Sequence, residues 1–379
     1  MSNRLYCAIL ALVFTTASSA YAQSATPAPP IVGAKSYFVV DATTGRELAS
    51  LDPDTPLAPA SLTKIMTTYV VFAALDQGRV RLADEVTISE KAWRTPGSRM
   101  FVEVGTRVTI EDLLMGLIVQ SGNDAGVALA EHVAGTEGVF AQMMNQYAQQ
   151  LGMFSSNFLN ATGLPAEGHV TTARDMATLA RAMIGEFPGY YAWHAVKEFE
   201  FNDIRQRNRN SLLWRDPSVD GIKTGHTDDA GYCLVASAER DGMRLVSVVL
   251  GMASEKARAD GSQALINYGF RFFETRLLFE AGEEVATARV WKSAHETSRL
   301  GVLDDLHITV PRGSYDKLES TLDLPAVVEA PVAAGQPVAE LRISLGGNEL
   351  LRTPLRALDD NPAGSLWQRL RDGVSLWFE

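Results

Sequence analysis

The chain has 379 residues and a formal net charge of −11. Its 46% hydrophobic and 21% charged residues are typical of a soluble globular protein with room for two domains. The acidic balance argues against nucleic-acid binding as the main function, so no nucleic-acid partner is expected.

A secretory signal peptide is predicted over residues 1–22. Arg4 gives a positive start, residues 5–15 form a short apolar core, and the sequence AYA at 20–22 precedes the cleavage site. The apolar run is shorter than the ~20 residues of a membrane-spanning helix, so cleavage is favoured over an anchor. Cys233 is then the only cysteine of the mature protein, and no internal disulfide is expected.

Residues 23–34, rich in Ala, Pro and Ser, are expected to form a loose leader. Residues 36–41 read as a strand that turns into a hairpin partner. Apolar periodicity predicts helices over 59–77, 110–119, 124–134, 138–151 and 257–273, and strands over 219–225, 231–238 and 245–251. Helices between a leading and a trailing set of antiparallel strands indicate a layered α/β domain over residues 35–275.

A small all-β domain, a sandwich, is predicted over residues 276–361. Its short β-like runs, separated by Gly, Pro and Asn turns, are 284–291, 307–310, 326–330, 340–344 and 350–358. No reactive cluster of residues lies there, so a spacing or interaction role is expected.

An amphipathic helix is predicted within the terminal segment, residues 362–379. Ser365 and Gln368 match a capping box. The apolar face consists of Leu366, Trp367, Leu370, Val374, Trp377 and Phe378. Aromatic side chains on one helical face suit a membrane interface, and the helix is too short to span a bilayer. A helix docked on the protein body is the alternative.

Three short motifs with chemically active side chains follow one another along the chain. They are Ser61-Leu62-Thr63-Lys64, Ser121-Gly122-Asn123 and Lys223-Thr224-Gly225. Each is weak alone, but in this order they indicate a serine acyl-enzyme site. Lys64 lies one helical turn after Ser61, so both side chains share a face. A lysine is a base only when burial and a nearby cation lower its pKa, and Lys223 is the expected cation.

With their flanking residues, these motifs resemble the low-molecular-mass penicillin-binding proteins that act as serine D-alanyl-D-alanine carboxypeptidases. The resemblance covers nearly the whole mature chain. It implies a penicillin-binding and β-lactamase-like catalytic domain over residues 35–275, an antiparallel sheet with helices, followed by the β domain and the terminal helix. The implied reaction removes the terminal D-alanine from peptidoglycan stem pentapeptides, which regulates cell-wall crosslinking and cell shape. β-Lactam antibiotics would be covalent inhibitors, and no cofactor is expected.

The resemblance also implies a role for each motif residue. Ser61 would be the nucleophile, Lys64 its proton acceptor, and Ser121 the relay to the leaving D-alanine. The substrate would be bound by Asn123, Lys223, Thr224, Gly225, His226 and Arg258. The backbone N–H groups of Ser61 and His226 would form the oxyanion hole, and residues 163–175 would floor the site. The enzyme would be periplasmic, held on the outer face of the inner membrane by its terminal helix.

Other activities that use similar residues can be checked against the sequence motifs that they require. A class A β-lactamase needs a glutamate on the floor loop, and Glu167 is nearby but lacks the E-x-x-x-N setting. The G-x-S-x-G elbow of Ser-His-Asp hydrolases does not occur. The H-E-x-x-H motif and paired-cysteine sites are also missing, so no metal is expected. A penicillin-binding cell-wall module with little turnover is the non-enzyme alternative.

Overall fold

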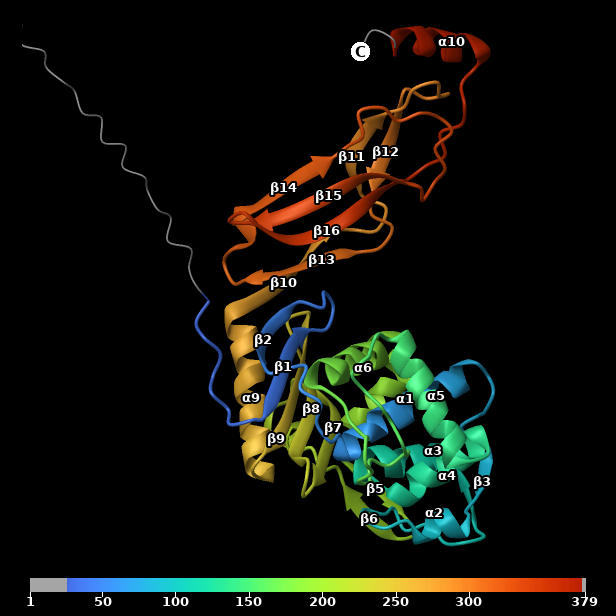
Figure 1. Ribbon diagram of the computed structural model, residues 1–379, viewed down its shortest axis with the longest axis vertical. Helices are drawn as coiled ribbons and strands as arrows, with labels where there is room; N and C mark the ends of the chain where they lie inside the picture. Colours follow the sequence, from blue (N-terminus) through green and yellow to red (C-terminus); the bar gives the residue numbers. More distant parts are fainter. Residues whose placement is uncertain (1–25, 377–379) are drawn as a thin grey trace, which may run out of the picture.

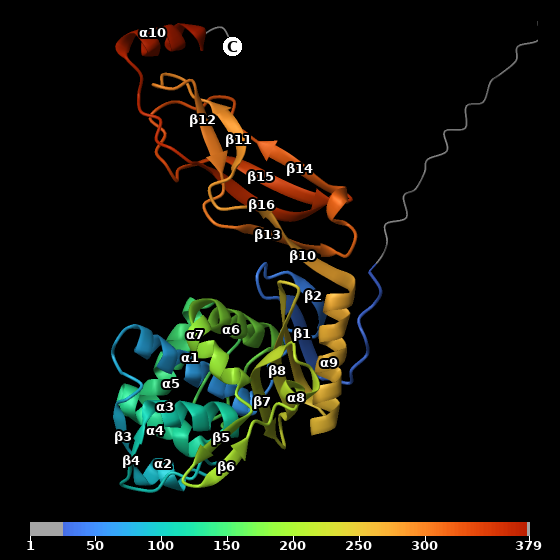
Figure 2. The same ribbon diagram turned by 180° about the vertical axis from the view of Figure 1, so that it is seen from behind.

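The computed structural model describes residues 26–376, so the predicted signal peptide lies outside the described residues. An α/β domain and a β domain follow each other along the long axis of the molecule, and the terminal helix α10 lies at the far end of the β domain (Figure 1). The view from behind shows the same order (Figure 2).

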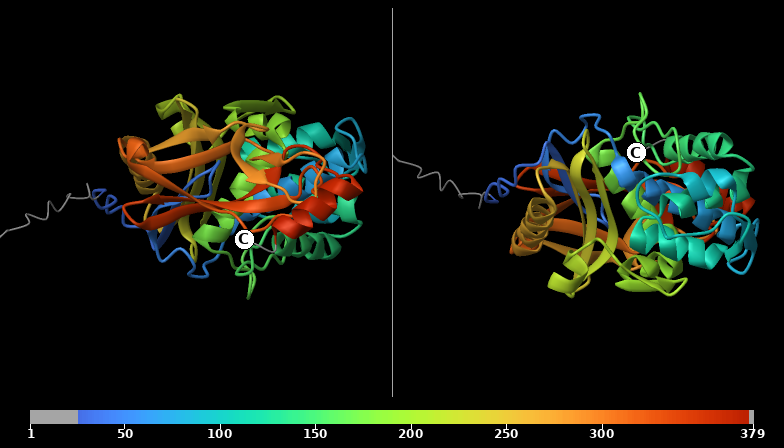
Figure 3. Two further views of the ribbon diagram at one scale, coloured as in Figure 1. Left: turned by 90° about the horizontal axis from the view of Figure 1, so that it is seen from above. Right: turned by 90° about the horizontal axis from the view of Figure 1, so that it is seen from below.

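A five-stranded antiparallel sheet forms the centre of the α/β domain, in the order β2-β1-β9-β8-β7. Its strands are β1 Ser36–Asp41, β2 Glu47–Leu51, β7 Val219–Thr227, β8 Gly231–Arg240 and β9 Met243–Met252. Helix α9, Glu255–Phe272, covers one face, and the helical lobe covers the other (Figure 3). Because β7 has a neighbour only in β8, its other edge is available for the site.

The helical lobe is built around α1, whose residues Thr63 to Leu75 are all buried. Around it lie η1 Ala60–Leu62, α1 Thr63–Asp76, α2 Glu90–Arg94, α3 Ile110–Met115, α4 Asn123–Ala134, α5 Glu137–Gln150, α6 Ala173–Glu186, α7 Pro188–Tyr191, η3 Ala192–Ala195 and α8 Leu212–Arg215. Two small hairpins pair β3 Glu85–Thr87 with β4 Arg107–Thr109, and β5 Glu198–Phe201 with β6 Ile204–Arg207. The helix predicted over 110–119 ends in a π-helical turn, η2 Gly116–Gln120, which leads into Ser121.

The β domain packs a two-stranded sheet against a five-stranded one. The two-stranded sheet consists of β10 Phe273–Phe279 and β13 Leu306–Pro311. The five-stranded sheet consists, in order, of β11 Glu284–Arg289, β12 Thr297–Gly301, β16 Asn348–Ala357, β15 Pro337–Leu345 and β14 Leu318–Asp323. The short η4 Tyr315–Lys317 lies between β13 and β14 in the chain. Ile308 and Val310 meet Leu341, Ile343 and Leu355 in its core. The prediction of a strand over 326–330 is wrong, because that run makes only one isolated β-bridge, from Glu329 to Trp291.

The terminal helix α10, Leu366–Ser375, leaves its apolar face in solvent. Ser365 and Gln368 form the predicted capping box. Leu366, Trp367, Leu370 and Val374 are between 62% and 83% exposed. On the polar side the Asp372 carboxylate accepts the N–H of Lys292 of the β domain at 2.8 Å. The helix therefore touches the β domain through a polar group. Trp377 and Phe378, also predicted on the apolar face, lie outside the described residues.

None of the helices within residues 26–376 combines the length and apolarity that a membrane span requires.

Candidate active site

Ser61 in η1 and Lys64 in the first turn of α1 lie one helical turn apart. The Lys64 Nζ donates to Ser61 Oγ at 3.0 Å and to the Thr162 carbonyl at 2.6 Å. Lys64 is only 1% exposed. Burial and, to a smaller extent, the Arg209 charge lower the pKa of Lys64 to about 7, while the Asp124 carboxylate opposes the shift. Near neutral pH a large share of Lys64 is therefore an uncharged amine beside the Ser61 hydroxyl.

Lys223, the expected cation, interacts with Lys64 through its charge. Arg209, which we did not predict, also lowers the Lys64 pKa, after burial. Lys223 is itself buried, and this burial, followed by the charges of Lys64, Arg209 and Arg258, holds its pKa well below the ordinary value. Arg209 donates to Ser98 Oγ at 2.9 Å and lines the cleft. The sequence contained no signal for Arg209, because it lies outside every motif.

The second motif presents two unpaired polar atoms. Ser121 ends the π-helical turn in the left-handed region, with φ of 67°. Within residues 26–376, its buried Oγ has no hydrogen-bond partner, and neither has Asn123 Oδ1. The Asn123 Nδ2 donates to the Pro96 carbonyl at 2.6 Å, which fixes the amide plane. Because buried polar atoms are normally paired, these two oxygens are suited to bind a substrate.

Asp124 holds the loop that lies over the second motif. Its carboxylate accepts the N–H groups of Met100, Phe101 and Val102 at 3.0, 2.9 and 3.3 Å. The backbone N–H of Asn123 donates to the Ser98 carbonyl at 2.7 Å. The loop and the motif are therefore fixed to each other by charge-assisted hydrogen bonds. Sequence reasoning did not single out Asp124.

The third motif lies on the edge strand β7 beside the nucleophile. A Cβ on Gly225 would lie 3.2 Å from the backbone N of Leu62 and from the carbonyl oxygen of Pro59. A glycine here lets β7 approach the turn that holds Ser61. Arg258, near the start of α9, donates to the Gly225 carbonyl at 3.4 Å and is therefore close to the motif, as predicted.

The floor loop reaches the site through two close contacts. Gly163 has φ of +82°, and a Cβ there would lie 1.8 Å from the carbonyl oxygen of Ala60. Thr63 Oγ1 and His169 Nε2 form a hydrogen bond of 3.0 Å. Burial lowers the pKa of His169 to about 4, so the ring is neutral at physiological pH.

A cleft of about 220 Å³ opens between the three motifs. The predicted residues that line it are Ser61, Ser121, Asn123, Thr224, Gly225, His226 and Arg258. Lys64 and Lys223 are buried and do not line it. Glu167 lines a neighbouring hollow instead of the cleft, so it is not placed as the water-activating base of a class A β-lactamase.

Comparison with known proteins identifies the family. The peptidase S11 family, described as D-alanyl-D-alanine carboxypeptidase, matches residues 23–254. The chain belongs to this family. The C-terminal domain of penicillin-binding protein 5 matches residues 273–363. The predicted family, fold class and enzyme class are therefore confirmed.

Relatives of the D-alanyl-D-alanine carboxypeptidase family cover nearly the whole chain. D-alanyl-D-alanine carboxypeptidase DacC of Escherichia coli K12 is 42% identical over 97% of this chain and 94% of its own. DacA of the same organism is 40% identical over 93% and 89%. The crystal structure of penicillin binding protein 5 from Haemophilus influenzae superposes with a TM-score of 0.86 at 41% identity, covering 89% of this chain and 99% of its own.

A more distant structure carries a β-lactam. Penicillin-binding protein D2 from Listeria monocytogenes in the ampicillin-bound form is 28% identical, with a TM-score of 0.58 over 63% of this chain and 98% of its own. The cefotaxime-bound form of that protein matches similarly, at 27% identity and a TM-score of 0.60.

Proposed function

We propose that this protein hydrolyses the terminal D-Ala-D-Ala bond of peptidoglycan stem pentapeptides through an acyl-enzyme on Ser61. The observation that carries the proposal is the 3.0 Å hydrogen bond between Lys64 Nζ and Ser61 Oγ, with a lysine pKa of about 7. A serine hydroxyl is a weak nucleophile without such a base, and a base works best when its pKa is near the working pH.

Acylation begins with attack of Ser61 Oγ on the carbonyl carbon of the penultimate D-alanine. The uncharged Lys64 takes the hydroxyl proton as the new O–C bond forms. The tetrahedral oxyanion would be held by the backbone N–H groups of Ser61 and His226. The C–N bond then breaks, and Ser121 passes a proton to the leaving amine of the terminal D-alanine. Water attacks the ester in the second half-reaction and regenerates Ser61.

Separate groups of the site would bind the amide and the terminal carboxylate of the substrate. The unpaired Oδ1 of Asn123, together with its amide group, would bind the acyl-side amide of the stem peptide. The terminal carboxylate would lie at the end of the cleft where Thr224, Arg209 and Arg258 are found, next to the buried Lys223. The guanidinium charges of Arg209 and Arg258 around one carboxylate favour a substrate with a free C-terminus.

The test of the nucleophile compares Ser61→Ala with wild type. We expect the variant to lose covalent labelling by a fluorescent penicillin and to release no D-alanine from a soluble pentapeptide. Its circular dichroism spectrum should stay unchanged, because only one hydroxyl is lost and the fold stays intact. Ser155→Ala, an exposed serine in the same domain, is the control and should behave as wild type. A stable penicilloyl adduct on Ser61→Ala would place the nucleophile elsewhere.

The same assays separate the rival functions. A cell-wall module with little turnover would take up the penicillin label but release no D-alanine. A class A β-lactamase would hydrolyse the penicillin rapidly and leave no lasting adduct. The position of Glu167 outside the cleft favours slow hydrolysis of the adduct.

We also propose that the mature protein is periplasmic and attached to the outer face of the inner membrane by α10. The exposed Leu366, Trp367, Leu370 and Val374 support this. Complete burial of such a side chain contributes about 1.5–3 kcal/mol, so partial insertion of four gives a few kcal/mol and reversible binding.

Deletion of residues 365–379 should release the enzyme into the soluble fraction with unchanged activity on small peptides. Leu370→Glu/Val374→Glu, which keeps the helix, should do the same because it removes only the apolar face. Salt should have little effect, since the attachment is apolar. A truncated protein that stays on the membrane would show that the anchor lies elsewhere.

A further inference from the structure

A hollow of about 630 Å³ lies where the two domains join, and arginines dominate its lining. We call it the junction groove. It is lined by Arg240, Asp241, Met243, Asn267, Phe270, Arg271, Glu274, Thr275, Arg276 and Arg312. Four cations face two carboxylates there, in a chain whose net charge is −11. The local charge is therefore opposite in sign to that of the whole protein.

Within residues 26–376, two of the four arginines in the junction groove make no contact ion pair, although the Glu274 carboxylate also interacts with Arg312 through its charge. Arg240 pairs with Asp216 at 2.6 Å, and Arg276 pairs with Glu274 at 2.9 Å. Arg271 and Arg312 have no carboxylate partner at ion-pair distance in the part of the chain that the structure describes. Arg312 donates instead to the carbonyls of Phe270 and Phe273, where α9 ends.

Three of the four arginines of the junction groove are held in place by the protein, and Arg271 is exposed. Arg240 donates to Ser218 Oγ and Asn267 Oδ1, both at 3.0 Å, and its guanidinium lies 4.5 Å from the centre of the Phe270 ring. Arg276 lies 4.7 Å from the centre of the Tyr315 ring. Fixed guanidinium groups lose less conformational entropy when they bind an anion, so such a surface is suited to recognise carboxylates.

The position of the junction groove distinguishes two possible sources of bound anions, lipid headgroups and the wall polymer. Arg258 beside the cleft and Arg271 in the groove are both on α9, thirteen residues apart, which corresponds to about 20 Å along the helix. The helix α10, our proposed membrane contact, lies at the opposite end of the β domain (Figure 1). Lipid headgroups would meet α10 and not the groove, whereas a wall polymer bound at the cleft is long enough to cover the distance to the groove.

We propose that the junction groove binds the carboxylates of peptidoglycan stem peptides other than the one being cut. This inference rests on the proposed function, because it assumes that the polymer in the cleft is peptidoglycan. The groove holds a neighbouring part of the same polymer, so the enzyme stays on the wall between cuts. Binding by this second site raises the local concentration of uncut stem peptides at the cleft.

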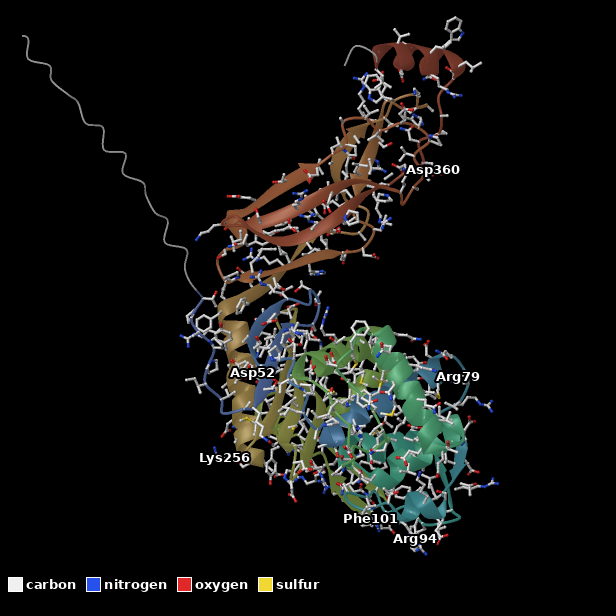
Figure 4. The ribbon with its side chains drawn as sticks, in the orientation of Figure 1. Asp52, Arg79, Arg94, Phe101, Lys256 and Asp360 are labelled. Carbon is white, nitrogen blue, oxygen red and sulfur yellow. The ribbon has the colours of Figure 1, made fainter. Side chains whose placement is uncertain are left out.

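The experiment compares two matched double variants of the mature full-length protein. Arg271→Glu/Arg276→Glu reverses one unpaired and one paired arginine of the groove. The control, Arg79→Glu/Arg107→Glu, makes the same change far from the junction: Arg79 has no ion-pair partner among residues 26–376, and Arg107 pairs with Glu85 at 3.2 Å. Arg79 is labelled on the helical lobe in Figure 4. Both proteins are checked by circular dichroism and penicillin labelling.

Binding to insoluble peptidoglycan is measured by co-sedimentation over a series of salt concentrations. We expect the groove variant to bind about five- to tenfold more weakly than the control at low salt and to lose part of the salt dependence. Release of D-alanine from intact peptidoglycan should fall in parallel, and kcat/KM on a soluble pentapeptide should stay within about twofold. Should the double variant fail to fold, Arg271→Ala alone should still weaken binding to peptidoglycan.

Three results would overturn the proposal: no binding of wild type to peptidoglycan at low salt, equal binding by both variants, or a groove variant that loses binding only to phosphatidylglycerol vesicles. The last would assign the groove to a phosphate headgroup. Failure of the proposed function is seen separately, as a wild-type protein that releases no D-alanine from the soluble pentapeptide.

Discussion

Replacing Lys64 by methionine should make the catalytic domain more stable at pH 7 and less active. Burial lowers the pKa of Lys64 from 10.5 to about 7, whereas in the unfolded chain the amine regains its ordinary pKa. Between these values the unfolded state binds more protons than the folded state, so stability rises with pH. The lysine therefore destabilises the fold most at low pH, and the destabilisation is lost as the pH approaches 10.5.

The magnitude follows from the pKa difference. About 3.5 pKa units correspond to about 5 kcal/mol when fully expressed, which leaves about 4 kcal/mol at pH 7 and about 1 kcal/mol at pH 10. Lys64→Met also loses the hydrogen bonds to Ser61 and to the Thr162 carbonyl, at a cost of about 1–3 kcal/mol at either pH. The variant should be about 1–3 kcal/mol more stable than wild type at pH 7, and equal or less stable at pH 10.

The assay is urea unfolding of both proteins at the two pH values, followed by circular dichroism. The decisive quantity is the change in the stability difference between pH 7 and pH 10, about 3 kcal/mol, because the lost hydrogen bonds cancel from it. Lys197→Met, at an exposed lysine, is the control and should show no such change. A stability difference for Lys64→Met that is the same at both pH values would refute the reasoning, since Lys64 would then be charged in the folded protein.

Two further predictions concern the loops around the site. Asp124→Ala should lower the free energy of unfolding by about 3–5 kcal/mol and strongly reduce D-alanine release, because three N–H groups of residues 100–102 lose their acceptor. An unchanged rate of D-alanine release would show that this loop does not hold Asn123 in its working position. Gly163→Ala should destabilise by about 3 kcal/mol or more and impair acylation, because its Cβ would overlap the Ala60 carbonyl. Gly168→Ala is the control, because Gly168 has the same φ of +82° and a Cβ there would lie 3.9 Å from its nearest neighbour. Equal losses of stability in both variants would show that the backbone conformation alone, and not the overlap with Ala60, causes the effect.

The chemistry of the site could be predicted from the sequence because the nucleophile and its base lie within one short motif. Ser61 and Lys64 share a helical turn, so their proximity needs no knowledge of the tertiary fold. The helices α1, α4, α5 and α9 and the three strands β7, β8 and β9 were also predicted, because their apolar residues recur with a regular period. The long helix α6 was not predicted. The roles of the site residues stay proposals until the variants are measured.

Elements without an apolar pattern could not be predicted in the same way. Strand β14 has five exposed residues out of six, and β12 alternates over only five residues, so neither resembles a buried strand. The run 326–330 is apolar but makes only one bridge, which shows that composition alone does not form a strand. The π-helical turn before Ser121 continues the helical periodicity, so the sequence did not reveal that the helix changes its hydrogen bonding there.

Arg209 illustrates the limit of motif reasoning most clearly. A charge acts on a buried lysine through space, and any segment that the fold brings near can supply it. Lys223 could be named because it belongs to a motif, and its charge interacts with that of Lys64. Arg209 could not be named, because the fold brings it to the cleft from the segment between β6 and α8. The same reasoning applies to Gly163 and Gly225, whose missing side chains let the floor loop and β7 approach the Ser61 turn. The pKa of Lys64 therefore depends on how closely three distant segments pack, which the sequence motifs do not encode.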